Sequence, residues 1–263
     1  MKSWKIAAFY RFFPQERLPE QAGTIRAYGD SQGIRGSVLL AAEGINATVA
    51  GPENKLDPFL QFLRERRQIP LREIKFSWSN LEPFPKFKVK IKPEIVTFRQ
   101  PGLDPGDPHA VGEYLAPTQW NELLRDPELT LIDTRNDYEY RVGHFPGALN
   151  PHTDDFTAFA DWVDHNLDPH RHSVVGMYCT GGIRCEKATA YLKKRGFAQV
   201  YHLQGGILKY LEDVPAKENQ WRGDCFVFDY RVALNRDLEP CGWAVCPRCH
   251  EPYNRACPCG YQI

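Results

Sequence analysis

The sequence contains no apolar run long enough to cross a membrane and no recognisable secretion signal. None of its hydrophobic stretches approaches the roughly 20 residues that a membrane-spanning helix requires. The first segment, Met1 to Phe13, includes Lys2, Lys5 and Arg11 and lacks a continuous apolar centre, unlike a secretory signal peptide. We therefore expect a cytoplasmic protein without a membrane partner.

Net charge is also absent, because 33 Lys and Arg side chains balance 33 Asp and Glu side chains. The balance conceals an uneven distribution. Residues 1–100 contain 17 basic and 10 acidic side chains, a net charge of +7, and residues 101–263 contain 16 and 23, a net charge of −7. A basic first part suggests an anionic partner, although compositional scatter would explain the same numbers.

The sequence lacks internal repeats, low-complexity tracts and any evident nucleotide-cofactor motif. It shows no signature of a flavin, a haem or a 2-His-1-carboxylate iron site. Cysteine, in contrast, is frequent: five of the eight cysteines fall between Cys241 and Cys259. Without a secretion signal, this clustering favours a metal or redox site in a reducing compartment over a disulfide framework.

The first hundred residues contain five predicted strands and two predicted helices, and the first four strands with the two helices follow the order β-α-β-β-α-β. Strands are expected at 5–13, 37–41, 45–50, 74–78 and 87–91, and helices at 18–32 and 55–66. This order fits a ferredoxin-like (acylphosphatase-like) α+β domain over residues 1–100.

Residues 101–114 are rich in Pro, Gly and Asp and predict a linker. From 115 to 220 the pattern changes, with strands expected at 129–132, 174–178 and 200–203 and helices at 137–142, 156–166 and 184–195. This alternation predicts an α/β domain with a parallel sheet. Residues 221–263 predict an irregular Cys-rich tail.

A Gly-rich loop follows the apolar segment 174–178 and precedes a predicted helix. Its sequence is Cys179-Thr180-Gly181-Gly182-Ile183-Arg184. A thiol on such a turn lies among backbone N–H groups at the positive end of the helix dipole. This environment favours a nucleophilic thiolate, which must be open to solvent or substrate to react. Four residues separate Cys179 from Arg184, one fewer than in phosphatase loops, so the loop suits a small group such as one extra sulfur. A cysteine that only packs at a strand end is the alternative.

Three segments over about residues 115–215 resemble a rhodanese domain. They are Asp133-Thr134-Arg135 with the stretch 139–150, the loop from Cys179 to Arg184, and the stretch 200–207. The resemblance implies that Cys179 forms a persulfide. It also implies that Asp133, Arg135 and His144 hold the surroundings of the loop and are not catalysts.

The stretches 40–48 and 83–92 resemble the first domain of the bacterial rhodanese-domain tRNA uridine hydroxylases. In that family a ferredoxin-like domain precedes the rhodanese domain and a cysteine-rich tail follows. The resemblance implies oxygen-dependent 5-hydroxylation of uridine 34, the wobble position, with molecular oxygen as co-substrate and the anticodon arm of tRNA as partner. Ala47 departs from the family pattern, which usually has Gly there, and the tail to Ile263 looks shorter than usual.

Lysines alternate with apolar residues in one predicted strand: Lys86, Lys88, Lys90 and Lys92 flank Phe87, Val89 and Ile91. Alternate side chains of a strand share a face. We therefore expect the lysines on one surface, about 6–7 Å apart, and the apolar residues in the core. The spacing matches phosphates along a nucleic-acid strand and predicts salt-dependent RNA binding. A strand that lysines guard against aggregation is the alternative. Trp78 and Phe84 are expected in the core rather than stacked on bases.

The tail contains two close cysteine pairs, Cys246 with Cys249 and Cys257 with Cys259. Four thiolates would bind one Zn²⁺ tetrahedrally, and the metal would order a segment too small for its own core. Cys241 and His250 are competing ligands. A thiol relay or disulfide, or cysteines without order, are the alternatives.

Cys185 directly follows the loop. It is either a resolving thiol for a persulfide or sulfenate on Cys179 or a buried small apolar residue.

Three functions remain, in this order. The first is tRNA uridine hydroxylation, in which Cys179 adds to C6 of the base or carries a reactive oxygen or persulfide species. The second is a rhodanese-type sulfurtransferase with a Cys179 persulfide, which residue chemistry alone would place first. The third is a non-enzymatic binding module, against which the intact Cys179 and Arg184 argue.

Overall fold

The computed structural model describes residues 4–67 and 74–260, without the side chains of residues 66 and 67. Residues 1–3 and 68–73 of the predicted first domain and residues 261–263 of the predicted tail lie outside the described residues. The chain divides into two compact units, Met1–Thr97 and Phe98–Ile263. No helix within the described ranges is both long enough and apolar enough to cross a membrane.

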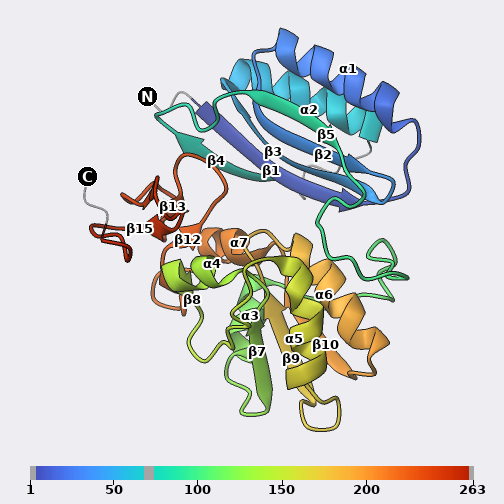
Figure 1. Cartoon of the computed structure of the whole chain (residues 1–263), viewed down its shortest axis with the longest axis vertical. Helices are drawn as coiled ribbons and strands as arrows, with labels where there is room; N and C mark the ends of the chain where they lie inside the picture. Colours follow the sequence, from blue (N-terminus) through green and yellow to red (C-terminus); the bar gives the residue numbers. More distant parts are fainter. Residues whose placement is uncertain (1–3, 68–73, 261–263) are drawn as a thin grey trace. The chain divides into compact units, whose positions relative to one another are not determined.

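The first unit contains a five-stranded sheet with two helices on one face (Figure 1). Its elements are β1 (Trp4–Phe12), α1 (Leu18–Ser31), β2 (Arg35–Ala41), β3 (Gly44–Gly51), α2 (Glu53–Arg67), β4 (Lys75–Ser79) and β5 (Phe87–Ile91). The strand order is β4-β1-β3-β2-β5, with β5 parallel to β2 and the other neighbours antiparallel. The predicted ferredoxin-like fold is confirmed, and β5 extends it by one edge strand.

The core of this unit lies between the sheet and the helices. Apolar side chains at alternate strand positions, such as Val38, Ala47 and Val49, meet Ile25 and Phe59 of the helices. Ala47 is 2% exposed and pairs with Val38. The core therefore accommodates a methyl group where the resembling family usually has Gly.

The lysine strand lies at the edge of this sheet as β5, and its alternation is only partly as predicted. Val89 is buried and Phe87 is half-buried, but Ile91 is 45% exposed. The prediction that all three apolar residues face the core is therefore wrong for Ile91. Ile91 ends an edge strand that has a neighbour on one side only, so little structure covers it.

The second unit is built on a parallel four-stranded sheet with the order β6-β10-β9-β7. Its elements are β6 (Glu113–Leu115), α3 (Pro117–Leu123), β7 (Leu129–Asp133), α4 (Asp137–Val142), β8 (Gly143–His144), η2 (Phe156–Ala158), α5 (Phe159–Asn166), β9 (Val174–Tyr178), α6 (Ile183–Lys194), β10 (Gln199–Leu203) and α7 (Gly206–Asp213). All five residues of the inner strand β9 are buried. The predicted α/β fold with a parallel sheet is confirmed.

Strand β6 and helices α3 and α7 of this unit have no counterpart in the sequence prediction. Strand β6 begins at Glu113, inside the segment predicted to be a linker, and two of its three residues are exposed, so it carries no apolar pattern. Helices α3 and α7 contain only 7 and 8 residues. Such short helices give little periodicity to detect.

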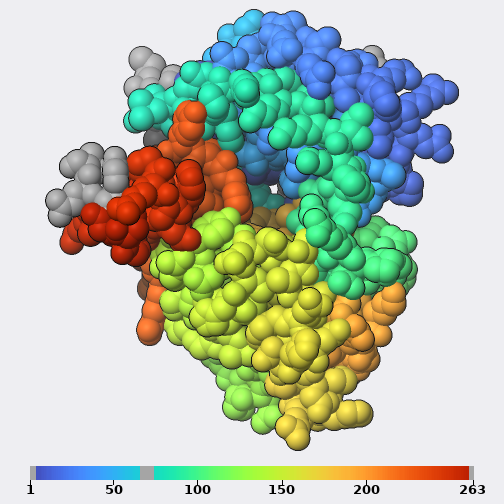
Figure 2. Space-filling model, viewed as in Figure 1, coloured from blue at the N-terminus to red at the C-terminus, as the bar shows by residue number. Residues whose placement is uncertain are grey.

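The C-terminal segment is irregular and rich in cysteine, as predicted. Within residues 221–260 its strands have two residues each: β11 (Arg222–Gly223), β12 (Cys225–Phe226), β13 (Ala233–Leu234), β14 (Ala244–Val245) and β15 (Pro252–Tyr253). β11 pairs with β8, and Phe226 packs with Val142 of α4. In Figure 2 the end of this segment, in red, lies against the yellow-green surface that includes α4.

Candidate active site

Cys179 stands at the carboxyl end of β9, where open parallel sheets place their sites. Gly182 ends the loop as the N-cap of α6 with φ 102°. Only glycine adopts this left-handed conformation without strain. The sequence therefore folds into a tight turn that directs the first N–H groups of α6 towards the cysteine.

The Cys179 sulfur is surrounded by hydrogen-bond donors. The N–H of Gly182 donates to Sγ over 3.1 Å. Burial alone would raise the pKa of the Cys179 thiol, but a hydrogen bond from the Cys185 side chain, the charge of Arg184 and backbone N–H groups lower it to about 5. The thiol is therefore ionised at neutral pH.

The sulfur is less open than expected. Cys179 is 1% exposed, because the donors that stabilise the thiolate also enclose it. Gly181 and Ile183 are partly exposed, so the loop reaches the protein surface at these two residues.

Arg184 is fixed by Glu139 of α4. Its Nη1 and Nη2 donate to the two carboxylate oxygens over 2.7 Å each, and Thr180 Oγ1 donates to Oε1 over 3.3 Å. All three side chains are buried. Burial would raise the pKa of Glu139, but Arg184 and then Arg135 lower it, so Glu139 stays ionised. Sequence reasoning did not assign Glu139 to the site, because its only signal was membership of the resembling stretch 139–150.

A second buried ion pair supports the wall behind the loop. Arg135 binds Asp133 through Nε at 2.9 Å and Nη2 at 2.7 Å, and both residues are fully buried. Nη2 also donates to the Gly143 carbonyl over 2.6 Å. Through these contacts Arg135 links Asp133, at the end of β7, to the backbone of Gly143. His144 contacts the Tyr140 carbonyl through Nδ1 at 3.1 Å.

The loop is also held from α7. The N–H groups of Ile207 and Leu208 donate to the carbonyls of Cys179 and Thr180 over 3.0 and 3.1 Å. A Cβ atom on Gly206, where φ is 67°, would lie 2.4 Å from the Cys179 carbonyl oxygen. The N–H groups of α7 thus bind the carbonyl side of the loop. The N–H of the loop residue Gly182 faces the Cys179 sulfur. Sequence reasoning missed this contact, although the pair Gly205-Gly206 was a visible signal.

Cys185 lies on the first turn of α6 and is fully buried. Burial, then its hydrogen bond to Cys179, raises the pKa of Cys185 well above its ordinary value. It is therefore a neutral thiol that donates to the Cys179 thiolate, and its Sγ is 3.7 Å from Thr134 Oγ1. Its assignment as a resolving thiol stays a prediction.

The four lysines of the β5 region belong to the first unit and are all exposed. The backbone hydrogen bonds between β2 and β5 continue past both ends of β5. The Gly36 N–H donates to the Lys86 carbonyl over 3.0 Å, and the Lys92 N–H donates to the Leu40 carbonyl over 2.8 Å. Among the residues that the structure describes, none of the four lysines forms an ion pair. Phe84 is 9% exposed and packs in a cluster with Ile6, so it belongs to the core as expected.

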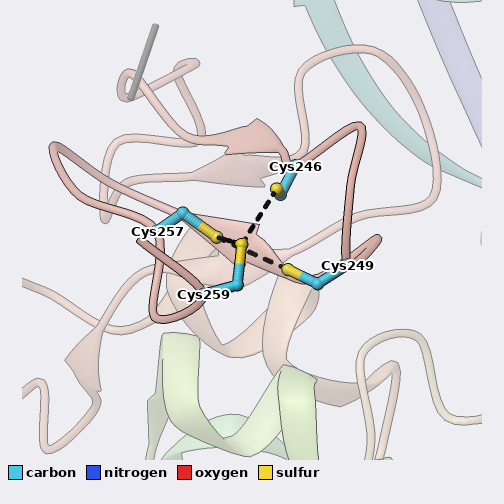
Figure 3. A group of neighbouring side chains, drawn as sticks. All are labelled: Cys246, Cys249, Cys257 and Cys259. Carbon is cyan, nitrogen blue, oxygen red and sulfur yellow. Dashed lines mark hydrogen bonds between the residues drawn. The ribbon is translucent and has the colours of Figure 1, made fainter. Parts of the chain in front are cut away.

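The structure brings the four predicted metal-binding cysteines together (Figure 3). The sulfurs of Cys246, Cys249, Cys257 and Cys259 all lie within 4.8 Å of one another. Neither competing ligand joins them: Cys241 lies in a different cluster and donates to the Ala233 carbonyl over 3.4 Å.

Comparisons with known proteins agree with both units. Residues 4–95 match the UPF0176 acylphosphatase like domain, and residues 116–213 match the rhodanese-like domain. A curated protein of Picosynechococcus sp. named tRNA uridine(34) hydroxylase is 48% identical over 252 residues, 96% of this chain and 84% of that protein. One of the same name from Teredinibacter turnerae is 46% identical over 254 residues, 97% of this chain and 78% of that protein.

Two solved structures match parts of the chain with low TM-scores. The rhodanese-like domain of the Anabaena sp. protein Alr3790 has a TM-score of 0.35 and 22% identity, covering 42% of this chain and 78% of that one. An acylphosphatase from Coxiella burnetii has a TM-score of 0.26 and 14% identity, covering 34% and 95%.

Proposed function

Because the chain belongs to the tRNA uridine(34) hydroxylase family, we propose that it catalyses oxygen-dependent 5-hydroxylation of uridine 34 in tRNA with Cys179 as the reactive group. The observation that carries this proposal is the Cys179 thiolate, held among N–H donors beside Arg184 in a chain of this family. Arg184 and the N–H groups stabilise negative charge at the sulfur or at an atom bound to it.

Two roles for the sulfur follow from uridine chemistry. Thiolate addition to C6 of the base makes C5 electron-rich, whereas in the second role the sulfur holds a reactive oxygen or persulfide species beside C5. The enclosure of Cys179, which is 1% exposed, supports the second role, because one added atom needs less space than a pyrimidine ring.

The proposed cofactors are molecular oxygen as co-substrate and one structural zinc ion. The zinc ion is assigned to Cys246, Cys249, Cys257 and Cys259. A site of four thiolates has no open coordination position, so zinc is given no part in the reaction. No nucleotide cofactor is included in the proposal.

We propose that the protein binds tRNA at the anticodon arm. A tRNA substrate implies a cytoplasmic location. Lys86, Lys88, Lys90 and Lys92 supply exposed positive charge along one edge strand. Such a row contacts phosphates without reading sequence. Position 34 lies in a single-stranded loop, where an unstacked base is accessible to an enzyme.

The test is nucleoside mass spectrometry of tRNA from a strain that lacks the gene and is complemented with variants. The wild-type gene restores 5-hydroxyuridine and its derivatives, and Cys179→Ala does not. Cys241→Ser is the matched control, since this half-buried thiol lies outside the loop and outside the tetrad. Normal 5-hydroxyuridine with Cys179→Ala contradicts the proposal.

The rhodanese-like match makes sulfur transfer the competing outcome. It is measured by thiosulfate:cyanide transfer with the purified protein. A useful transfer rate that requires Cys179, together with unchanged tRNA in the deletion strain, replaces the hydroxylase with a sulfurtransferase.

A further inference from the structure

The cysteine tetrad has the dimensions of a metal site rather than of a disulfide pair. The sulfurs of Cys246 and Cys259 are 3.7 Å apart, those of Cys249 and Cys257 3.4 Å, and those of Cys257 and Cys259 3.3 Å. A disulfide requires about 2.05 Å. Tetrahedral Zn²⁺ with bonds of about 2.3 Å to sulfur separates its ligands by about 3.8 Å. In Figure 3 the four side chains come from two turns and direct their sulfurs to one centre.

The two turns that carry the cysteines have the same design. In each, a proline follows the first cysteine. In each, the residue after the second cysteine is left-handed, His250 with φ 61° and Gly260 with φ 76°. In the first turn, the Arg248 N–H also points at the Cys246 sulfur over 3.4 Å. Left-handed backbone is uncommon outside glycine, so its use at His250 indicates that both turns are shaped to present two sulfurs each.

The segment around the tetrad has almost no hydrophobic core of its own. Apart from the four cysteines, its cluster contains only Tyr253 and the partly buried Ala244. Its sheet consists of β14 and β15, two residues each. A segment of this kind is ordered by a metal ion, whose binding free energy becomes folding free energy.

The tetrad is connected to the catalytic loop through one helix. Glu251 lies between the two turns, and its backbone carbonyl accepts the Cys246 N–H over 3.0 Å. Its carboxylate contacts Nη2 of Arg141 on α4 at 2.5 Å. The same helix carries Glu139, which fixes Arg184. Glu251 therefore reaches the helix that positions the loop only while its own turn is ordered.

We propose that Cys246, Cys249, Cys257 and Cys259 bind one structural Zn²⁺, and that the resulting zinc knuckle braces α4 through the Glu251–Arg141 ion pair. The knuckle thereby holds Glu139 in place for Arg184. This role rests on the tetrad and on α4, and the part that concerns catalysis rests on the proposed function of Cys179.

The metal is tested by elemental analysis of the full-length protein purified without chelator. We expect one zinc per chain, and less than about one tenth of that in the double variant Cys246→Ser, Cys257→Ser, because two lost thiolates remove half of the ligand set. Cys241→Ser keeps one zinc per chain. Stoichiometric iron, no metal, or disulfides among the four cysteines in peptide mass spectrometry overturns the zinc site.

The brace is tested by hydrogen exchange of residues 137–142, a measurement that needs neither tRNA nor oxygen. Removing zinc from the wild-type protein with a chelator accelerates exchange in α4 at least tenfold, because the whole knuckle loses its order. Glu251→Ala keeps the backbone carbonyl and the Arg141–Asp137 pair within α4, retains one zinc per chain, and accelerates exchange roughly two- to fivefold, the range for an exposed ion pair. Arg236→Ala, an exposed arginine of the same segment, changes neither quantity. Unchanged α4 exchange after zinc removal overturns the brace. Since tRNA hydroxylation is measured separately, failure of the brace and failure of the proposed function give different results.

Discussion

Arg184 and Glu139, 45 positions apart in the sequence, form a buried bidentate ion pair in which both N–O distances are 2.7 Å. The pair joins the loop of Cys179 to α4. Arg184 lowers the pKa of Cys179, and Glu139 holds both Arg184 and the loop residue Thr180. Glu139 is thus a positioning residue.

We expect Glu139→Gln to lower the free energy of unfolding by roughly 3–5 kcal/mol, the cost of leaving one charge of a buried pair without its partner. Chemical denaturation at pH 7 measures this. Glu122→Gln, an exposed glutamate of α3, should stay within about 0.5 kcal/mol of the wild type. Equal effects of the two substitutions would contradict the role assigned to Glu139.

The same pair gives a pH dependence with a defined sign. The folded protein lowers the pKa of Glu139, so its stabilisation is present above the unfolded value of about 4.3 and is lost as the pH falls through the lower folded value. The stability difference between the wild type and Glu139→Gln should therefore be constant near neutral pH and shrink below about pH 4. A difference that grows on acidification would reverse the assignment.

The Cys179 thiolate should be visible by its ultraviolet absorbance near 240 nm. The difference between the wild type and Cys179→Ala should titrate with a midpoint at about 5, against an ordinary value of 9.0. Between these values the unfolded chain holds the proton that the folded protein lacks, so the stability contributed by this group rises with pH from 5 to 9 and is lost as the pH falls through 5. A midpoint near 9 would show that the loop does not stabilise the thiolate.

The neutral thiol of Cys185 has a separate, measurable part in that shift. Its hydrogen bond is the largest of the effects that lower the pKa of Cys179. Cys185→Ala should therefore move the midpoint of the Cys179 titration upward. Cys185→Ser keeps a hydrogen-bond donor and should keep the midpoint close to that of the wild type. Cys225→Ala removes another fully buried thiol that makes no hydrogen bond to Cys179, and should leave the midpoint unchanged.

The sequence predicts most of this fold because its long elements carry clear periodicity. The strands at β5 and β9 and the helix α4 have the predicted bounds, and the parallel sheet follows from the alternation around them. The features that the sequence did not predict depend on contacts between residues far apart in the chain. The pairing of Glu139 with Arg184 leaves no local pattern, and the glycine pair before α7 does not by itself indicate which loop α7 contacts, because each contact joins segments that meet only after the sheet has formed.

Local signals succeeded where one segment determines the geometry. The spacing of the tail cysteines predicted that four sulfurs would meet, and the structure brings them within 4.8 Å. The same kind of reasoning failed for Ile91, whose burial depends on what lies beyond an edge strand. Periodicity assigns a residue to a face, but it does not determine whether another element covers that face.

Gly206 should be indispensable for a reason other than its left-handed backbone. A Cβ atom there would lie 2.4 Å from the Cys179 carbonyl oxygen and 2.7 Å from that of Thr180. Gly206→Ala should displace the loop, raise the pKa of Cys179 and lower the melting temperature. Gly196→Ala is matched for backbone strain, since its φ is 89° and nothing lies within 4 Å of its Cβ position; it should cost only about 1–2 kcal/mol. Equal behaviour of the two variants would mean that contact with the loop is unimportant.

The lysine strand should bind RNA through charge alone. Lys88 and Lys90 are exposed and point from the same face of β5, so each should contact one phosphate. Replacing each lysine by alanine should reduce the slope of log affinity against log salt by about 0.7 for a single-stranded anticodon loop, and the double variant by about twice that. Lys55→Ala removes an exposed lysine from α2 of the same unit and should leave the slope unchanged. The measurement is a salt titration of the binding of an anticodon stem-loop by fluorescence anisotropy. Equal slopes for the wild type and the double variant would assign the lysines to protection of the sheet edge and remove them from the RNA interface.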